Sequence, residues 1–133
     1  MKIVECPCGG KRYATCCGRY LDGIALAPDA EALMRSRYVA YVRHNDTYLR
    51  ATWDPKTCPV GGLVEQPAPK WIALQVLSHR EEGDAATVEF IARYKIGGRA
   101  HRLYEVSRFV RKPTASGEMA WLYVDGSFPG AHA

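Results

Sequence analysis

Four of the five cysteines lie within residues 6–17, where they form two close pairs separated by residues 9–15. Two pairs of thiolates brought together by such a spacer can surround one zinc ion as a tetrahedron, about 2.3 Å from each sulfur. Glycines at the start of the spacer allow the tight turn that this arrangement requires. The spacing therefore predicts a zinc site whose ligands are Cys6, Cys8, Cys16 and Cys17.

The alternatives for these thiols are a vicinal disulfide, a redox pair and four unliganded cysteines. The chain begins without an apolar secretory segment, so we expect a cytoplasmic, reducing location that favours metal over disulfides. A site filled by four cysteines leaves no position for a reactive water, so the zinc is expected to be structural. Cys58 has no partner nearby in the sequence and is interpreted as an ordinary small side chain.

The cysteine segment has the pattern Cys6-Pro7-Cys8-Gly9, then Lys11 and Tyr13, then Cys16-Cys17. This pattern resembles the SEC-C zinc motif, which also ends the bacterial preprotein-translocation ATPase. The resemblance implies a small zinc-binding knob, which we place at residues 1–23. A segment of this size buries too little apolar surface to fold alone, so bound metal should supply most of its folding free energy.

Two helices are expected after the knob. Pro28-Asp29 offers an N-cap, and apolar residues recur at helical spacing over residues 29–44. Asn45-Asp46 is a second cap signal, for a shorter helix that must end before Pro55. Residues 54–69 hold four prolines and are expected to be irregular, either as a flap over a pocket or as a loose loop.

From residue 70 onward the pattern is that of β-strands, which we expect at residues 71–79, 85–96, 99–111 and 119–125. Helices followed by consecutive strands indicate an α+β domain, in which two helices pack on one face of an antiparallel sheet of about four strands. If Gly97-Gly98 is a two-residue turn, Ile96 lies opposite Arg99. That register places Val88, Phe90, Ala92 and Tyr94 opposite Ser107, Glu105, Leu103 and His101 on the inward face.

This register turns Glu105 toward the helices, where a lone charge would cost several kcal/mol. One interpretation is a structural ion pair with Arg35 or Arg37 that fixes the helix on the sheet. The other is a pocket in which Glu105 is a general base or a ligand acceptor, His101 is an acid and tryptophans form the walls. No familiar enzyme signature occurs, so no catalytic residue is assigned and the enzyme alternative is not favoured. The pocket candidates are Arg35, Arg37, Tyr41, Trp53, His101, Glu105, Ser107 and Trp121.

Composition limits the class of protein. The chain has 133 residues, 47% of them apolar, and a net charge of +4, which fits one folded domain with a small appendage and excludes a disordered chain or a membrane span. Residues 93–112 hold seven Lys or Arg and one acid. This hairpin could contact nucleic acid, anionic lipid or an acidic protein, or be merely solvated. Its basic surface candidates are Arg93, Lys95, Arg102 and Arg108.

A second pattern extends over nearly the whole chain. It consists of residues 28–38, which include Leu33-Met34-Arg35-Ser36-Arg37-Tyr38, then Tyr48-Leu49, Thr52-Trp53, and residues 105–109 and 121–126. The pattern resembles the YchJ family of bacterial proteins. That resemblance implies a nuclear transport factor 2-like domain, placed at residues 28–130, in which helices and a curved antiparallel sheet enclose a cone-shaped cavity. The family has no established activity, so no catalytic residue carries over.

The function expected from these observations is that of a cytoplasmic adaptor whose zinc knob binds a protein partner. The first alternative is an enzyme or small-ligand binder that uses the cone around Glu105, which rests on analogy between folds. The second alternative is contact with nucleic acid or the ribosome through residues 93–112.

Overall fold

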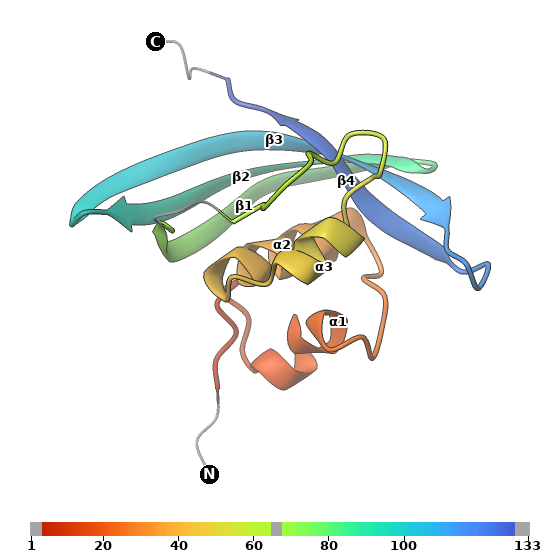
Figure 1. Ribbon diagram of the computed structural model, residues 1–133, viewed down its shortest axis with the longest axis horizontal. Coiled ribbons are helices and arrows are strands. Elements are labelled where there is room, and N and C mark those ends of the chain that lie inside the picture. Colours follow the sequence, from red (N-terminus) through yellow and green to blue (C-terminus); the bar gives the residue numbers. More distant parts are fainter. Residues whose placement is uncertain (1–3, 65–67, 130–133) are drawn as a thin grey trace.

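The computed structural model describes residues 4–64 and 68–129, which stack in three layers (Figure 1). A curved sheet is one layer, two helices cover one face of it, and the knob lies on the far side of the helices. Within the knob are a 3-10 helix at Tyr13–Thr15 and the short helix α1 at Gly18–Leu21. The covering helices are α2 (Ala30–Val42) and α3 (Asp46–Ala51). The strands are β1 (Lys70–Glu82), β2 (Ala85–Ile96), β3 (Arg99–Pro113) and β4 (Met119–Ser127).

The four strands lie in chain order, each antiparallel to the next. Ile96 is opposite Arg99, and the same register continues to Ala85 opposite Val110, so the predicted hairpin is confirmed. Two register shifts in the β1–β2 ladder and one in the β3–β4 ladder bend the sheet toward the helices. The predicted α+β architecture of two helices on a curved four-stranded sheet is confirmed.

Helix α2 lies in the middle layer and is buried on two sides. Asp29 caps it as predicted, because its Oδ1 accepts a hydrogen bond from the Ala32 amide at 2.7 Å. Leu33 and Tyr38 belong to the main hydrophobic cluster. The buried hydroxyl of Ser36 is 2.7 Å from the Tyr48 hydroxyl of α3, so a small polar residue lets the two helices approach closely.

Helix α3 ends by joining the edge of the sheet. Asn45 caps its start, accepting from the Tyr48 amide at 3.0 Å. Beyond its end, Tyr123 of β4 donates its amide to Thr52 O and accepts from the Asp54 amide, both at 2.8 Å. These two bonds hold the intervening Trp53 in a parallel bridge to β4 and so fix its side chain beneath the sheet.

The core lies between the helices and the sheet. Phe109, Leu33 and Val88 are buried almost completely, and each such side chain contributes about 1.5 to 3 kcal/mol to stability. Side chains alternate along β2, so Ile91 points to the face of the sheet away from the helices, where an exposed side chain is expected. Ile91 on that face is only 7% exposed, and its register partners are Tyr104 of β3 and Gln75 of β1. Of the helices in residues 4–64 and 68–129, none has the length and apolar composition for crossing a bilayer.

Candidate metal centre and ligand cavity

The four N-terminal thiols converge on one point. The Sγ atoms of Cys6, Cys8, Cys16 and Cys17 all lie within 4.8 Å of one another, with 3.5 Å between Cys8 and Cys16. Four sulfurs around one tetrahedral zinc are about 3.8 Å apart, whereas a disulfide needs about 2.05 Å. All the described cysteines are free. The donor set and its spacing therefore fit a metal ion held by four thiolates.

Tight backbone turns bring these thiols together. The Gly9 amide donates to Cys6 O at 3.1 Å, which closes a turn around the first pair. A Cβ on Gly10 would lie 2.7 Å from the Cys16 Sγ, and one on Gly18 would lie 2.6 Å from Tyr13 O. Both glycines are therefore needed for the loop to wrap closely around the sulfur cluster.

The thiols strongly affect one another's ionisation. A hydrogen bond from the Cys17 thiol lowers the pKa of Cys8 to about 5, against the opposing effect of burial. Burial raises the pKa of Cys16 to about 11, and the Cys8 sulfur, together with burial, raises the pKa of Cys17. Four thiolates this close repel one another, so a bound cation is required to keep all of them ionised.

The knob is docked on helix α2. Arg35 of α2 donates from Nη1 to Cys8 O at 3.0 Å and from Nε to Glu31 at 3.0 Å. The Arg43 guanidinium lies 3.8 Å from the centre of the Tyr13 ring, a cation–π contact. The buried cysteines also belong to the same hydrophobic cluster as α2. The knob and this helix are therefore in direct contact.

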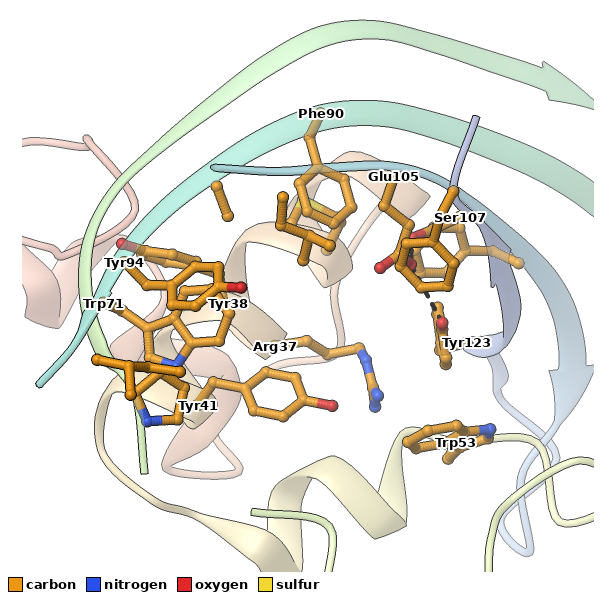
Figure 2. A pocket seen from close by; sticks show the side chains of 17 residues that line it. Arg37, Tyr38, Tyr41, Trp53, Trp71, Phe90, Tyr94, Glu105, Ser107 and Tyr123 are labelled. Atoms are coloured by element: carbon orange, nitrogen blue, oxygen red, sulfur yellow. Dashed lines mark hydrogen bonds between the residues drawn. The ribbon is translucent and has the colours of Figure 1, made fainter. Parts of the chain in front are cut away.

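On its other side, α2 faces the sheet across a cavity of about 370 Å³ (Figure 2). Nine of the 17 lining residues are aromatic. Arg37 from the helix and Glu105 from the sheet both point into the cavity. The aromatic lining residues are Tyr38, Tyr41, Trp53, Trp71, Phe90, Tyr94, Phe109, Tyr123 and Phe128.

Glu105 is only 7% exposed. Its Oε2 accepts hydrogen bonds from the Ser107 hydroxyl and, at 3.1 Å, from the Tyr123 hydroxyl. Burial raises the pKa of Glu105, and these two hydrogen bonds oppose the effect. A Cβ on Gly126 would overlap this carboxyl, so glycine opposite Ser107 on β4 leaves the space that the carboxyl occupies. Ser107, Tyr123 and the backbone at Gly126 therefore hold the carboxyl in place, and its raised pKa favours the neutral form.

Arg37 is 4% exposed. Its Nη1 donates to Leu49 O and to Thr52 Oγ1, both at 2.7 Å, and its guanidinium lies over the rings of Trp53 and Tyr123, 5.0 and 4.6 Å from their centres. Burial lowers the pKa of Arg37, yet a guanidinium remains charged. Among the described residues, no carboxylate oxygen lies within 4.0 Å of it.

Five of the eight pocket candidates line this cavity: Arg37, Tyr41, Trp53, Glu105 and Ser107. The other three need correction. Arg35 binds Cys8 O, because residues two apart on a helix point in nearly opposite directions. His101 lies at the exposed end of the hairpin, stacked on Tyr94 at 5.2 Å. Trp121 is buried next to Arg111, outside the cavity.

Sequence reasoning missed Tyr123, which donates to Glu105 and flanks Arg37. Its two-residue spacing from the buried Trp121 was a usable signal, because alternate residues of a strand share a face.

The four basic surface candidates differ in whether their charge is paired. Arg93, Lys95 and Arg102 are exposed, and Arg93 lies directly opposite Arg102. Arg108, by contrast, donates two hydrogen bonds of 2.6 Å to Asp125, so its charge is already paired. The free positive charge on this part of the sheet is therefore smaller than the sequence suggests.

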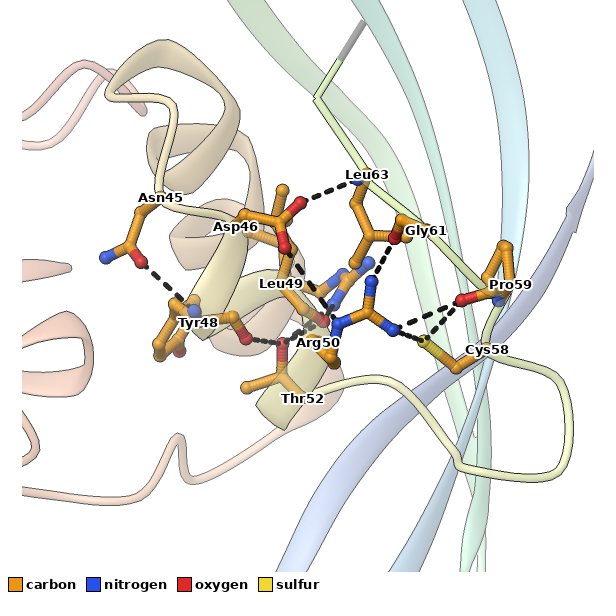
Figure 3. Close-up of polar contacts among 11 residues, drawn as sticks. Asn45, Asp46, Tyr48, Leu49, Arg50, Thr52, Cys58, Pro59, Gly61 and Leu63 are labelled. Carbon is orange, nitrogen blue, oxygen red and sulfur yellow. Dashed lines mark hydrogen bonds and ion pairs between the residues drawn. The ribbon is translucent and has the colours of Figure 1, made fainter.

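The irregular segment after α3 is tied to that helix over its described part (Figure 3). Arg50 donates to Pro59 O, Gly61 O and the Cys58 Sγ, and the Leu63 amide donates to Asp46 Oδ1 at 2.6 Å. Residues 58–63 are therefore not a loose loop. The predicted segment 54–69 includes residues 65–67, which lie outside the described residues. Of the rest, only Pro69 lines the cavity, so we find no flap in this part of the segment.

The fold and the four-cysteine knob together define a class of protein, the SEC-C motif proteins with an α+β cone. A solution structure of a SEC-C motif containing protein from Rhodopseudomonas palustris is 35% identical, with a TM-score of 0.79 over 94% of this chain and 98% of that one. A crystal structure of a sec-c motif containing protein from Psychrobacter arcticus is 26% identical, with a TM-score of 0.76 over 95% of this chain and 83% of that one.

Residues 29–126 match the family described as "YchJ, middle NTF2-like domain". A UPF0225 protein of Cupriavidus pinatubonensis is 56% identical over 94% of this chain and 89% of its own length. Another UPF0225 protein, from Ralstonia nicotianae, is 52% identical over 91% of this chain and 89% of its own length. The chain belongs to the YchJ family, so the resemblance seen in the sequence is confirmed.

Proposed function

We propose that the chain binds a small, largely apolar molecule in the cavity between α2 and the sheet, and that a structural zinc ion in the knob braces α2. The cavity volume of about 370 Å³ lies within the range of roughly 300 to 1,000 Å³ that is usual for small-molecule sites. Aromatic walls with a few converging polar groups are the usual composition of such sites.

The observation that carries this proposal is that Arg37 and Glu105 point into one cavity without pairing with each other. A void in a core lowers stability, and protein interiors are normally filled. Desolvating two ionisable groups lowers stability further. A packing defect would not place both of these groups at its surface, whereas a binding site requires polar groups of this kind.

Calorimetric titration with indole, a neutral aromatic probe, tests the proposal. Ala92 is a buried lining residue, so Ala92→Leu fills the cavity and should weaken indole binding by about tenfold or more. The matched control is Ala73→Leu, on the outer face of the sheet opposite Arg93, which should bind like the wild type. Equal binding by both variants, or no indole binding by the wild type, would contradict a ligand site here.

The zinc part of the proposal is supported by the four convergent sulfurs. Soft thiolates at tetrahedral spacing suit zinc, and with all four positions filled the ion would be structural. Metal analysis of protein purified under reducing conditions should find about one zinc per chain. Cys8→Ser should lose it, whereas Cys58→Ser, outside the cluster, should retain it.

A protein-binding role for the knob is a second candidate, favoured by its outward surface. Val4 in the knob, and Ile24 and Leu26 just after it, are 58%, 77% and 47% exposed, and the knob residues Lys11, Arg12 and Arg19 are exposed as well. The double variant Ile24→Ser, Leu26→Ser removes apolar surface without touching the cysteines. If it retains zinc and indole binding but no longer captures proteins that the wild type captures, the adaptor function is supported. Unchanged capture would contradict it.

A further inference from the structure

One edge of the buried Arg37 guanidinium takes no part in the hydrogen bonds that this residue donates to α3 and the turn after it. Arg37 donates two hydrogen bonds, one to Leu49 O in α3 and one to Thr52 Oγ1 just after that helix. Both come from Nη1. Neither Leu49 O nor Thr52 Oγ1 accepts a hydrogen bond from the Nε and Nη2 edge of the guanidinium. A guanidinium presents paired N–H donors that match the two oxygens of a carboxylate. Because no carboxylate of residues 4–64 and 68–129 lies within 4.0 Å of it, the buried cation lacks the partner that its geometry suits best.

Glu105 offers a complementary feature across the cavity. Both hydrogen bonds that the described residues give to its carboxyl end on Oε2. Figure 2 shows this carboxyl pointing into the cavity above the Arg37 guanidinium, with Trp53 and Tyr123 beside them. A ligand carboxylate bound to Arg37 would therefore lie close to the Glu105 carboxyl.

The geometry points to a small aromatic monocarboxylic acid as the ligand, with its carboxylate on the free edge of Arg37 and one of its oxygens accepting a hydrogen bond from the protonated carboxyl of Glu105. This inference rests on the proposed function, since it names the ligand class of the same cavity. The ring of the acid would pack among the aromatic side chains on the opposite side, including Trp71, Phe90 and Tyr94.

The proton requirement follows from the charges around Glu105. Two carboxylates at hydrogen-bond distance cannot both be ionised, so one of them must take a proton when the acid binds. Burial already raises the pKa of Glu105, and the nearby Asp125 acts in the same direction, whereas Arg37 and Tyr123 favour its ionised form. The titratable side chains of α2 that line the cavity are Arg37, Tyr38 and Tyr41. Glu105 is therefore the group that takes up the proton, which comes from the buffer.

Calorimetry with phenylacetate and its neutral isostere phenylacetamide, on the zinc-loaded full chain, tests the inference. Phenylacetate should bind about tenfold more tightly than phenylacetamide, because only the acid pairs with Arg37. Titrations in HEPES and in Tris, which differ in ionisation enthalpy, should show proton uptake approaching one per phenylacetate bound at a pH where free Glu105 is ionised. Glu105→Gln should remove the proton uptake, and Arg37→Lys should reduce the preference for the acid.

Failure of this inference is distinguishable from failure of the proposed function. Equal affinity for acid and amide, or binding of indole alone, would overturn the carboxylate assignment while the cavity remained a ligand site. Binding of phenylacetate without proton uptake would overturn the role of Glu105. Phenylacetate that binds Ala92→Leu as tightly as the wild type would place the acid outside the cavity and also overturn the inference.

Discussion

Arg37 and Glu105 approach one cavity from opposite layers, the helix and the sheet, and each is satisfied by neutral partners instead of by the other. Arg37 uses a carbonyl, a hydroxyl and two ring faces, and Glu105 uses the hydroxyls of Ser107 and Tyr123. Tyr123 contacts both groups and so links them. The chain thus maintains two desolvated ionisable groups in a position where a ligand can bridge them.

Glu105→Gln should change how stability depends on pH. Burial raises the pKa of Glu105, so the folded chain holds this proton more tightly than the unfolded chain. Its stabilising effect is fully present below the unfolded pKa of about 4.3 and is lost as pH rises through the folded pKa. Glutamine has no such proton. Urea unfolding between about pH 5 and pH 8 should therefore show the wild type losing stability relative to the variant as pH rises.

Parallel pH profiles for the two proteins would show that Glu105 is not perturbed by its site. A loss of about 3 to 5 kcal/mol in Glu105→Gln at neutral pH would instead identify a structural ion pair.

Gly126→Ala should destabilise the chain because a Cβ there overlaps the Glu105 carboxyl. Overpacking of this kind costs about 1 to 3 kcal/mol. If the carboxyl is the cause, the effect of Gly126→Ala should be much smaller when Glu105 is replaced by Ala, which a double-mutant cycle of unfolding free energies measures. Additive effects of the two substitutions would place the clash elsewhere.

Arg35→Met should loosen the metal site without removing a ligand. The Arg35 guanidinium donates to Cys8 O and so helps to hold the first pair of thiolates. Loss of supporting hydrogen bonds around metal ligands weakens binding by about 10- to 100-fold. Transfer of zinc to a chromophoric chelator should be correspondingly faster than in the wild type. Arg80→Met, an exposed residue of β1 far from the knob in sequence, is the control and should release zinc at the wild-type rate.

Arg50→Met should free the segment after α3. This residue anchors Pro59 O and Gly61 O, and the Leu63 amide next in the segment is held by Asp46. Exchange of the Leu63 amide hydrogen should become faster, whereas the global unfolding free energy should change by no more than about 1 kcal/mol, because Arg50 is exposed. Unchanged exchange at Leu63 would mean that Arg50 does not hold the segment.

The sequence was sufficient for the features that depend on local periodicity. The caps at Asp29 and Asn45 and the Gly97-Gly98 turn act over a few residues, so they predicted α2, α3 and the β2–β3 register. The register in turn placed Glu105 on the inward face, because side chains alternate along a strand.

The errors concern side chains whose direction depends on packing between layers. The sequence offers Arg35 as one of two candidate partners for Glu105, but the knob docks on its side of α2 and Arg35 donates to Cys8 O instead. Trp121 and Tyr123 share a strand face, yet the bent β3–β4 ladder places only Tyr123 in the cavity. His101 follows the inward alternation of β3 but lies near the Gly97-Gly98 turn, where it is exposed and stacks on Tyr94. Such positions depend on how layers meet, which periodicity does not encode.

Arg35 and Arg37 of the same helix contact the knob and line the cavity respectively, so a metal bound in the knob should stabilise the cavity through α2. The most direct test is to titrate indole into the zinc-loaded wild-type chain, and again after a chelator has removed the zinc under reducing conditions, with re-addition of zinc as the reversal. We predict that removal weakens indole binding by about tenfold or more and that zinc restores it. Identical indole affinity with and without the metal would contradict the coupling of knob and cavity.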